Sequence, residues 1–378
     1  MKPRGISILD ILIGIALFGT LLALLFPSLL RARESVRRNQ CSDNLRHYVV
    51  ALHQYHDMHF SFPAATGVLL DRATDTIRRD YGTTFFLLPY LGEGARYASI
   101  VSDEHIPDVA ADDHRLQGTL SMLLCPSDGN AYLPGIVNKT ARSNIMTSRS
   151  DVAFHNNAGC YDIEYNNRNG TYAEAGLNRS VFHPVLGLLG EEMLHTWKSK
   201  DEITAGLGNT IAVSESVSAV SHQSRQIRGG VATFIMINSP SPLPPSNCLA
   251  HTIDHKHPLL LAHDLEISRS ARGNVFTDGS PARSGFTTIL APNSPSCNNR
   301  MNAWETPERG WGIFSTSSHH IGKGVNVAFF DGSVHFVSEK IDTGDLYAPQ
   351  PKYKHEPSPY GVWGAMGFPY AIEPLLQP

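Results

Sequence analysis

The fold is decided by residues 6–30, ISILDILIGIALFGTLLALLFPSLL, an apolar run in which Asp10 is the only charged residue. A helix rises about 1.5 Å per residue, so roughly 20 apolar residues are enough to cross a bilayer. The run therefore predicts a membrane-spanning helix over about residues 6–30. A buried helix of a soluble protein is the alternative. A cleaved secretory signal is disfavoured, because RARE at 31–34 follows the run where a small-residue cleavage site is expected.

The apolar run begins within the stretch GISILDIL, residues 5–12, which follows a short basic leader, residues 1–5. This stretch resembles the processing site of type IV prepilins. The resemblance implies that a prepilin peptidase cuts after Gly5 and that the new amine of Ile6 is methylated. This chain has Ile6 where the family usually has phenylalanine, and Asp10 where it has glutamate. Pro27 falls where pilins carry a helix-kinking proline.

The carboxylate of Asp10 needs an explanation within an apolar run. A charge at mid-bilayer costs on the order of 3 kcal/mol, so it asks for a partner. In pilin assemblies that partner is the free amine of a neighbouring subunit, which Ile6 offers here. The alternative is that Asp10 lies near the membrane interface and reaches water.

The basic residues that flank the run favour the opposite orientation. Four arginines follow the run, and they outnumber the two basic residues of the leader (Arg31, Arg33, Arg37 and Arg38 against Lys2 and Arg4). The positive-inside rule alone would therefore place the head in the cytoplasm. The prepilin resemblance instead implies a single pass of the inner (cytoplasmic) membrane, with the head in the periplasm or at the cell surface.

The helix is expected to continue beyond the apolar run. Leu45, Val49, Leu52 and His56 recur at helical spacing and form one amphipathic stripe. This spacing predicts a helix that runs on to about residue 57, within an N-terminal segment of residues 6–60. Its second half is expected to bury the stripe against a sheet, and SFP at 61–63 ends it.

Seven short motifs are spread over nearly the whole chain: CSDNLR at 41–46, ALHQYHDMH at 51–59, FP at 62–63, LLPYL at 87–91, LCPSD at 124–128, GNT at 208–210 and PNSPSC at 292–297. Together they resemble the DUF1559 family, which has pilin-like N-termini. The family's C-terminal signature is a histidine, a spacer of nine and Asp-Gly. Its counterpart is His320, Asp331 and Gly332, with one extra residue in the spacer.

The head, residues 61–378, is expected to be β-rich. Short β-prone runs alternate with Gly, Pro, Asn and Ser, as in NTIAVSE at 209–215 and GVATFIMI at 230–237. Asp331-Gly332 between VNVAFF and SVHFV predicts a hairpin with a type I′ turn. We expect a loop at 239–246 and a packed closing segment, YGVWGAMG at 360–367. The predicted fold class is α+β, a pilin-like long N-terminal helix on a mostly antiparallel β head with long loops.

The five cysteines are scattered, and no C-x-x-C pair is present, so neither a zinc ribbon nor a thioredoxin-type motif is expected. Cys41 and Cys125 both belong to family motifs, so the resemblance implies a disulfide that staples the helix to the head. Cys248 and Cys297 are expected to pair likewise, which leaves Cys160 odd. Buried free thiols are the alternative.

Candidates for a cofactor are few. His53 and His56 lie three apart on the helix, with His59 nearby, and two such rings are able to share a divalent metal. The alternative is that histidines near a helix C-terminus cap its carbonyls. No other cofactor is expected.

Enzymatic and nucleic-acid functions are not expected. The chain lacks G-x-S-x-G, H-E-x-x-H and Walker A motifs, so we predict no catalytic site. Its formal charge of -4, with acids and bases interspersed, gives no polybasic field for nucleic acid.

Together these features predict a membrane-anchored, pilin-like or pseudopilin-like surface protein that serves as a subunit of a filament or of a type II secretion apparatus. Its partners would be the prepilin peptidase, the membrane and other pilin-like subunits. The alternative is an anchored extracytoplasmic module that binds a carbohydrate or a divalent metal and tolerates the loss of Asp10.

Overall fold

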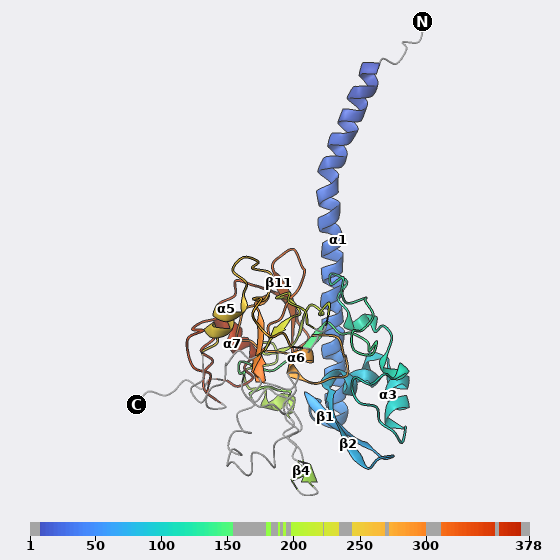
Figure 1. Ribbon diagram of the computed structural model, residues 1–378, viewed down its shortest axis with the longest axis vertical. Coiled ribbons are helices and arrows are strands. Elements are labelled where there is room, and N and C mark those ends of the chain that lie inside the picture. The colour runs from blue at the N-terminus through green and yellow to red at the C-terminus, as the bar shows by residue number, and fades with distance from the viewer. Residues whose placement is uncertain are drawn as a thin grey trace.

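The computed structural model describes residues 8–153, 179–182, 188–189, 192–193, 198–221, 223–233, 244–268, 272–299, 311–351 and 355–371. Helix α1, Ile8–His59, dominates the shape. Its first half projects from the head and bends gently, and its second half is embedded in the head (Figure 1). The long N-terminal helix expected from the sequence is therefore present.

The projecting half of α1 leaves apolar side chains uncovered. Twelve large ones are 47 to 78 % exposed: Ile8, Ile11, Leu12, Ile13, Ile15, Leu17, Phe18, Leu21, Leu25, Phe26, Leu29 and Leu30. Across the described ranges, no helix combines the length and the apolarity needed to cross a membrane.

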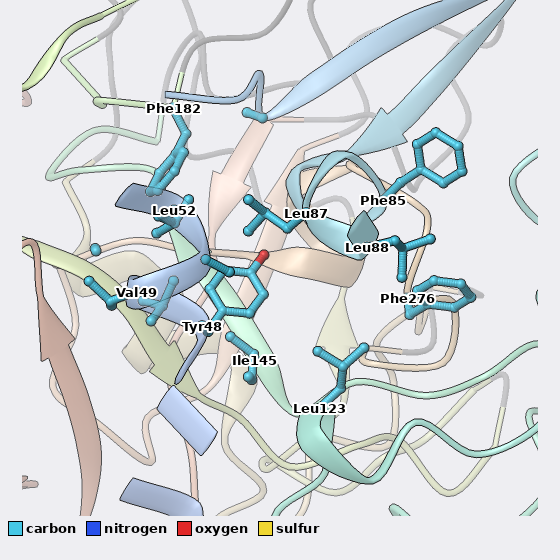
Figure 2. Packing of buried hydrophobic residues seen from close by; sticks show 14 of the residues in the cluster. Tyr48, Val49, Leu52, Phe85, Leu87, Leu88, Leu123, Ile145, Phe182 and Phe276 are labelled. Carbon is cyan, nitrogen blue, oxygen red and sulfur yellow. The ribbon is translucent and has the colours of Figure 1, made fainter. Parts of the chain in front are cut away.

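The second half of α1 supplies the main core. Leu45, Val49 and Leu52 are buried, as the stripe predicts, and Tyr48 lies beside them (Figure 2). Burying each of the aliphatic side chains is worth about 1.5–3 kcal/mol. The Tyr48 hydroxyl is satisfied by Thr84 Oγ1 at 2.9 Å. The helix ends at His59, two residues beyond the predicted end, because Phe60 adopts a left-handed φ of 58°.

A five-stranded sheet lies against this half of α1. Its order is β12 (Val334–Ser338), β11 (Gly324–Phe329), β6 (Ile211–Glu215), β3 (Ile145–Ser148) and β8 (Gly285–Phe286). Both central strands, β6 and β11, are buried throughout. Ala328 and Val213 pack in the cluster with α1, whereas Val325 and Val327 pack with Trp363 of α7 (Gly361–Gly367). The sheet is therefore covered on both faces, and the predicted packing of the closing segment is confirmed.

The remaining elements are short. Strands β1 (Thr66–Asp71) and β2 (Thr76–Gly82) form a hairpin, β4 (Leu188–Leu189) pairs with β5 (Glu192–Met193), and β7 (Val231–Ala232), β9 (Ser296–Asn299) and β10 (Trp311–Ile313) form a third sheet. Short helices join them: α2 (Thr83–Leu87), α3 (Gly94–Val101), α5 (Ser246–Thr252) and α6 (Pro281–Ser284), with 3-10 turns η1 (Leu88–Leu91), η2 (His114–Leu116), η3 (Ser121–Leu123) and η5 (Lys200–Glu202).

The β head is mostly antiparallel, as expected, but two pairs are parallel: β3 with β8, and β7 with β9. The strand expected at 230–237 is described only as far as residue 233. Most of the loop expected at 239–246 lies outside the described residues, and α5 begins at its last residue, Ser246.

The turn between β11 and β12 is not the type I′ turn that the sequence predicts. Gly332 has a left-handed φ of 88°, but Asp331 does not share it. The N–H of Gly332 donates to Phe329 O at 3.0 Å, and the N–H of Phe329 donates to Ser333 O at 2.9 Å, so the loop is one residue longer than predicted. The side chain of Asp331 accepts from the N–H and the hydroxyl of Ser333, which closes a local side-chain turn within the loop.

Buried arginines hold the loops that the short strands leave unsupported. Arg272 donates to the carbonyls of Gly285 and Ser315, and Arg142 donates to those of Ala219 and Pro134. Burial lowers the pKa of Arg272 to about 9. Arginine side chains thus take the place of ladder hydrogen bonds in this part of the core.

Candidate functional site

Side chains from four distant segments converge where α1 enters the head. Glu34 and Cys41 come from α1, Cys125 follows η3, Glu215 ends β6 and His320 precedes β11. Within the described residues, one group of His, Cys, Asp and Glu side chains brings its ligating atoms together, all within 4.8 Å: Cys41, Cys125, Glu215 and His320.

His320 sits between two carboxylates. Its side chain is 1 % exposed, its Nδ1 lies 2.7 Å from Glu34 Oε1, and its Nε2 lies 3.2 Å from the carboxylate of Glu215. Both carboxylates receive a hydrogen bond only when both ring nitrogens carry a proton. The geometry therefore favours the imidazolium form.

The electrostatics agree with this geometry. Burial by itself lowers the pKa of His320, because a charged ring loses its hydration. The hydrogen bonds and charges of Glu215 and Glu34 outweigh that effect and raise the pKa above the ordinary 6.5. His320 thus links a carboxylate on α1 to one in the sheet.

Glu215 is fixed by the strand beside it. Its carboxylate accepts the N–H of Asn326, on β11, at 2.6 Å. The side-chain nitrogen of Asn326 lies 3.3 Å from Nε2 of His320. Because β6 and β11 are paired, the last residue of β6 faces the segment that carries His320.

A disulfide between Cys41 and Cys125 lies beside His320, whose Nε2 is 3.9 Å from Cys125 Sγ. It joins α1 to the loop after η3, and Asn44 reinforces the joint by donating to Leu124 O at 2.7 Å. The second bridge, between Cys248 and Cys297, joins α5 to β9. Both predicted disulfides are present in the structure.

The loop that carries Cys125 is held by a buried carboxylate. Asp128 Oδ2 accepts from the Asn144 side chain and from the N–H of Ser218, both at 2.7 Å. Asn144 Oδ1 in turn accepts the N–H of Cys125 at 2.8 Å. The LCPSD motif therefore positions the cysteine.

A hollow of about 410 Å³ opens beside the site, between α1 and the segment 320–322. Arg31, Glu34 and Arg38 line it from α1, and His320 and Ile321 line it from the head. The guanidinium of Arg38 lies 3.8 Å from the centre of the Phe336 ring. The hollow thus borders the site and combines two arginine side chains with the carboxylate of Glu34.

The three histidines proposed as weak metal candidates face separate partners. His53 Nε2 lies 2.5 Å from Phe330 O, His56 Nε2 lies 3.2 Å from the N–H of Lys200, and His59 Nε2 lies 3.3 Å from the hydroxyl of Tyr90. The structure does not bring His53, His56 and His59 together as one ligand set. They join the end of α1 to three different parts of the head.

The residues of the C-terminal signature are divided. His320 belongs to the converging group, whereas Asp331 and Gly332 shape the turn at the far end of β11. The signature thus combines one residue of the site, His320, with the turn of the β11–β12 hairpin that follows it in the chain.

The predicted processing residues Gly5 and Ile6 lie outside the described residues. The backbone of α1 includes Asp10 and Pro27, but the description does not extend to their side chains.

Two carboxylates of the site were not predicted from the sequence. Glu34 stands among arginines and is typical of a solvated helix face, and Glu215 ends a β-prone run as strand-ending polar residues often do. The available signal is weak: Glu215 is a carboxylate next to a buried strand, in the stretch that follows the GNT motif.

These features define a class of protein, an α+β chain whose long N-terminal helix is locked to a β head by a disulfide and a buried histidine with two carboxylates. The chain belongs to the family described as protein of unknown function (DUF1559), whose model matches residues 31–344. Neither a comparison with curated proteins nor one with solved structures found a match.

Proposed function

We propose that the chain is a type IV pilin-like protein, processed by a prepilin peptidase and anchored by residues 6–30 with its head outside the cytoplasm. One observation carries the proposal, namely the uncovered apolar half of α1 that projects from the head. Moving a fully exposed large apolar side chain out of water is worth about 1.5–3 kcal/mol. The twelve partly exposed side chains therefore strongly favour burial against an apolar partner. Membrane lipid and the same helices of neighbouring subunits are the covers that a pilin uses.

The crossing of a membrane by residues 6–30 rests on their sequence. Asp10 is the only charge in the run, and the basic leader precedes it. The described part of α1 does not by itself indicate that residues 6–30 cross a membrane. The crossing is therefore tested through the N-terminal residue of the mature chain.

The two disulfides support a head outside the cytoplasm. Disulfides form and persist in oxidising compartments and are rare in the cytosol. This argument is independent of the arginines after the run, which alone favour a cytoplasmic head.

The proposed role is assembly or display, not catalysis. At the described site the sulfurs of Cys41 and Cys125 are bonded to each other, and His320 is held by Glu34 and Glu215. These contacts join α1 rigidly to the sheet, which suits a subunit whose helix must carry its head in a fixed orientation.

The test is intact mass and N-terminal sequencing of the full chain isolated from its native membrane fraction. We expect a chain that begins at Ile6, with or without a methyl group on its amine. A Gly5→Leu variant should keep its leader, whereas a Ser7→Ala variant should be processed normally. A wild-type chain that begins at Met1 would overturn the pilin assignment and leave an ordinary anchor with a binding head.

A further inference from the structure

We infer that the joint between α1 and the head is also a zinc site. When the Cys41–Cys125 disulfide is reduced, one Zn²⁺ binds between four side chains: Cys41, Cys125, Glu215 and His320. The inference does not depend on the pilin assignment, because all four residues lie in the described head and in the half of α1 embedded there.

The donor set suits zinc. Zinc takes thiolate sulfur, imidazole nitrogen and carboxylate oxygen in tetrahedral sites, at about 2.0–2.3 Å, which places the ligand atoms about 3.3–3.8 Å apart. His320 Nε2 is 3.2 Å from the carboxylate of Glu215 and 3.9 Å from Cys125 Sγ. The ligating atoms of all four residues lie within 4.8 Å of one another. The main movement required is the separation of the two sulfurs once their bond is broken.

The surroundings of these ligands match those of metal sites. A metal-bound histidine usually donates its other ring N–H to a carboxylate, which fixes the ring and its tautomer. His320 Nδ1 has that partner in Glu34, 2.7 Å away, while its Nε2 faces Glu215 and Cys125. Glu215 is itself held by the N–H of Asn326 at 2.6 Å. Both ligands are thus oriented before a metal arrives.

Burial completes the site. Cys41 is 2 %, Cys125 7 %, Glu215 3 % and His320 4 % exposed, so all four ligands lie within the protein and not on its surface. The cysteines come from α1 and the loop after η3, and the other two ligands come from the sheet side. One ion would therefore join the same elements that the disulfide joins.

The chemistry balances as two separate steps. A dithiol reductant transfers two electrons and two protons to the disulfide, giving two thiols on the protein and a disulfide in the reductant. Zinc then binds as both thiols and Nε2 of His320 each release a proton to solvent. A disulfide oxidant reverses this by taking two electrons from the two thiolates: the S–S bond of the protein forms again, the oxidant becomes a dithiol, and Zn²⁺ is released because a disulfide sulfur no longer offers a thiolate. The joint is closed by metal under reducing conditions and by the S–S bond under oxidising ones.

The test uses the full chain in non-ionic detergent with Co²⁺ as the probe. After reduction by a dithiol and its removal under anaerobic conditions, we expect about one Co²⁺ per chain, a thiolate-to-cobalt charge-transfer band and a tetrahedral visible spectrum. Zn²⁺ should displace the Co²⁺ and abolish both signals. The oxidised protein should show neither signal.

Matched variants separate this site from the other cysteines. Cys248→Ser with Cys297→Ser removes the second bridge, and Cys160→Ser removes the odd thiol, yet both should keep the cobalt spectrum. Glu34 is not one of the four ligands. Glu34→Gln should nevertheless weaken Co²⁺ affinity about 10–100-fold, because it removes the carboxylate that orients His320. Glu215→Gln should lose the tetrahedral spectrum.

Failure of a variant to fold would not decide the matter, because the reduced wild-type chain is itself decisive. No cobalt spectrum from a reduced wild type that re-forms its disulfides on oxidation would overturn the inference. A spectrum that survives Glu215→Gln and Glu34→Gln unchanged, but disappears with Cys248→Ser, would place the metal elsewhere and overturn it equally.

Discussion

His56 illustrates how a single side chain at the end of α1 couples the fold to pH. The residue is 6 % exposed, and its Nε2 accepts the N–H of Lys200 at 3.2 Å, so the ring is neutral with its proton on Nδ1. Burial and then the charge of Lys200 lower the pKa of His56 below the ordinary 6.5, and Asp57 and Asp201 oppose that shift while His53 adds to it.

We expect acid to destabilise the protein through His56. Between pH 6.5 and the lower pKa that His56 has in the folded chain, the unfolded chain binds a proton at His56 that the folded chain does not. The free energy of unfolding therefore falls as pH falls through this range. Each unit by which the pKa is lowered corresponds to about 1.4 kcal/mol. Denaturant titrations from about pH 7.5 to about pH 5 should give a smaller acid loss in His56→Gln than in the wild type. The exposed His59, changed to Gln, is the control, and equal curves for wild type and His56→Gln would refute the assignment.

The buried ion pair between Arg179 and Asp151 predicts a much larger effect than a pair at the surface. Both side chains are 0 % exposed, with Arg179 Nε 2.8 Å from Asp151 Oδ1. Asp151→Asn removes the buried negative charge that faces this guanidinium, which costs about 3–5 kcal/mol. In the exposed pair of Arg46 and Asp43, Asp43→Asn should cost less than about 1 kcal/mol. Free energies of unfolding for the two variants test the contrast, and similar losses would contradict it.

For single residues, the sequence predicts contacts that follow from helical periodicity. It does not predict contacts between residues that only the tertiary fold brings together. Leu45, Val49 and Leu52 are buried as expected, because helical spacing alone places them on one face. Glu34 and Glu215 could not be assigned, since neither has its partner nearby in the sequence: His320 lies 286 residues beyond Glu34.

At the scale of elements, the disulfide at Cys41 holds the longest element to the head. The two bridges have sequence separations of 84 and 49 residues, so the chain-entropy model gives them similar worth, about 4.6 and 4.1 kcal/mol. Their places differ, however, because only Cys41–Cys125 holds α1. Loss of either should lower global stability alike, whereas only loss of the first should loosen the joint.

We therefore expect the paired serine variants to differ in hydrogen exchange. In Cys41→Ser with Cys125→Ser, amides of α1 from about Glu34 to Asn44 should exchange faster at denaturant concentrations that leave the head folded. In Cys248→Ser with Cys297→Ser, these amides should keep wild-type protection. Unchanged protection of α1 in the first variant would mean that core packing alone holds the helix.

Prediction of elements succeeded where the signal is local. The helix, its end near Pro63 and the β11–β12 hairpin are encoded in adjacent residues. The parallel pairs of β3 with β8 and of β7 with β9 are not, because each joins strands far apart in the sequence. The turn at Asp331 differs from the predicted type because the loop is one residue longer than expected and only Gly332 takes a left-handed φ.

The whole molecule is an amphiphile with its two parts in series. The family match begins at residue 31, just after the uncovered apolar half of α1 ends at Leu30. The family match therefore covers the head and the embedded half of α1, and the proposed anchor precedes it. Glu34, only four residues beyond Leu30, already contacts His320 and Ser127 of the head. Only a short segment of α1 thus lies between its exposed apolar half and the residues that hold the helix to the head.

This arrangement makes Asp10 the residue that separates a filament subunit from a lone anchor. If residues 6–30 pack against neighbouring subunits, the Asp10 carboxylate pairs with the amine of a neighbouring Ile6, and an unpaired charge there costs on the order of 3 kcal/mol. Asp10→Asn removes the charge and keeps the size, whereas Asp10→Glu keeps a carboxylate and introduces the residue usual in prepilins. We expect both variants to be processed at Gly5, but only Asp10→Asn to lose chemical cross-linking between subunits in native membranes. Normal cross-linking of Asp10→Asn would leave the anchor role intact and refute assembly through this pair, because an anchor needs no partner for Asp10 beyond water.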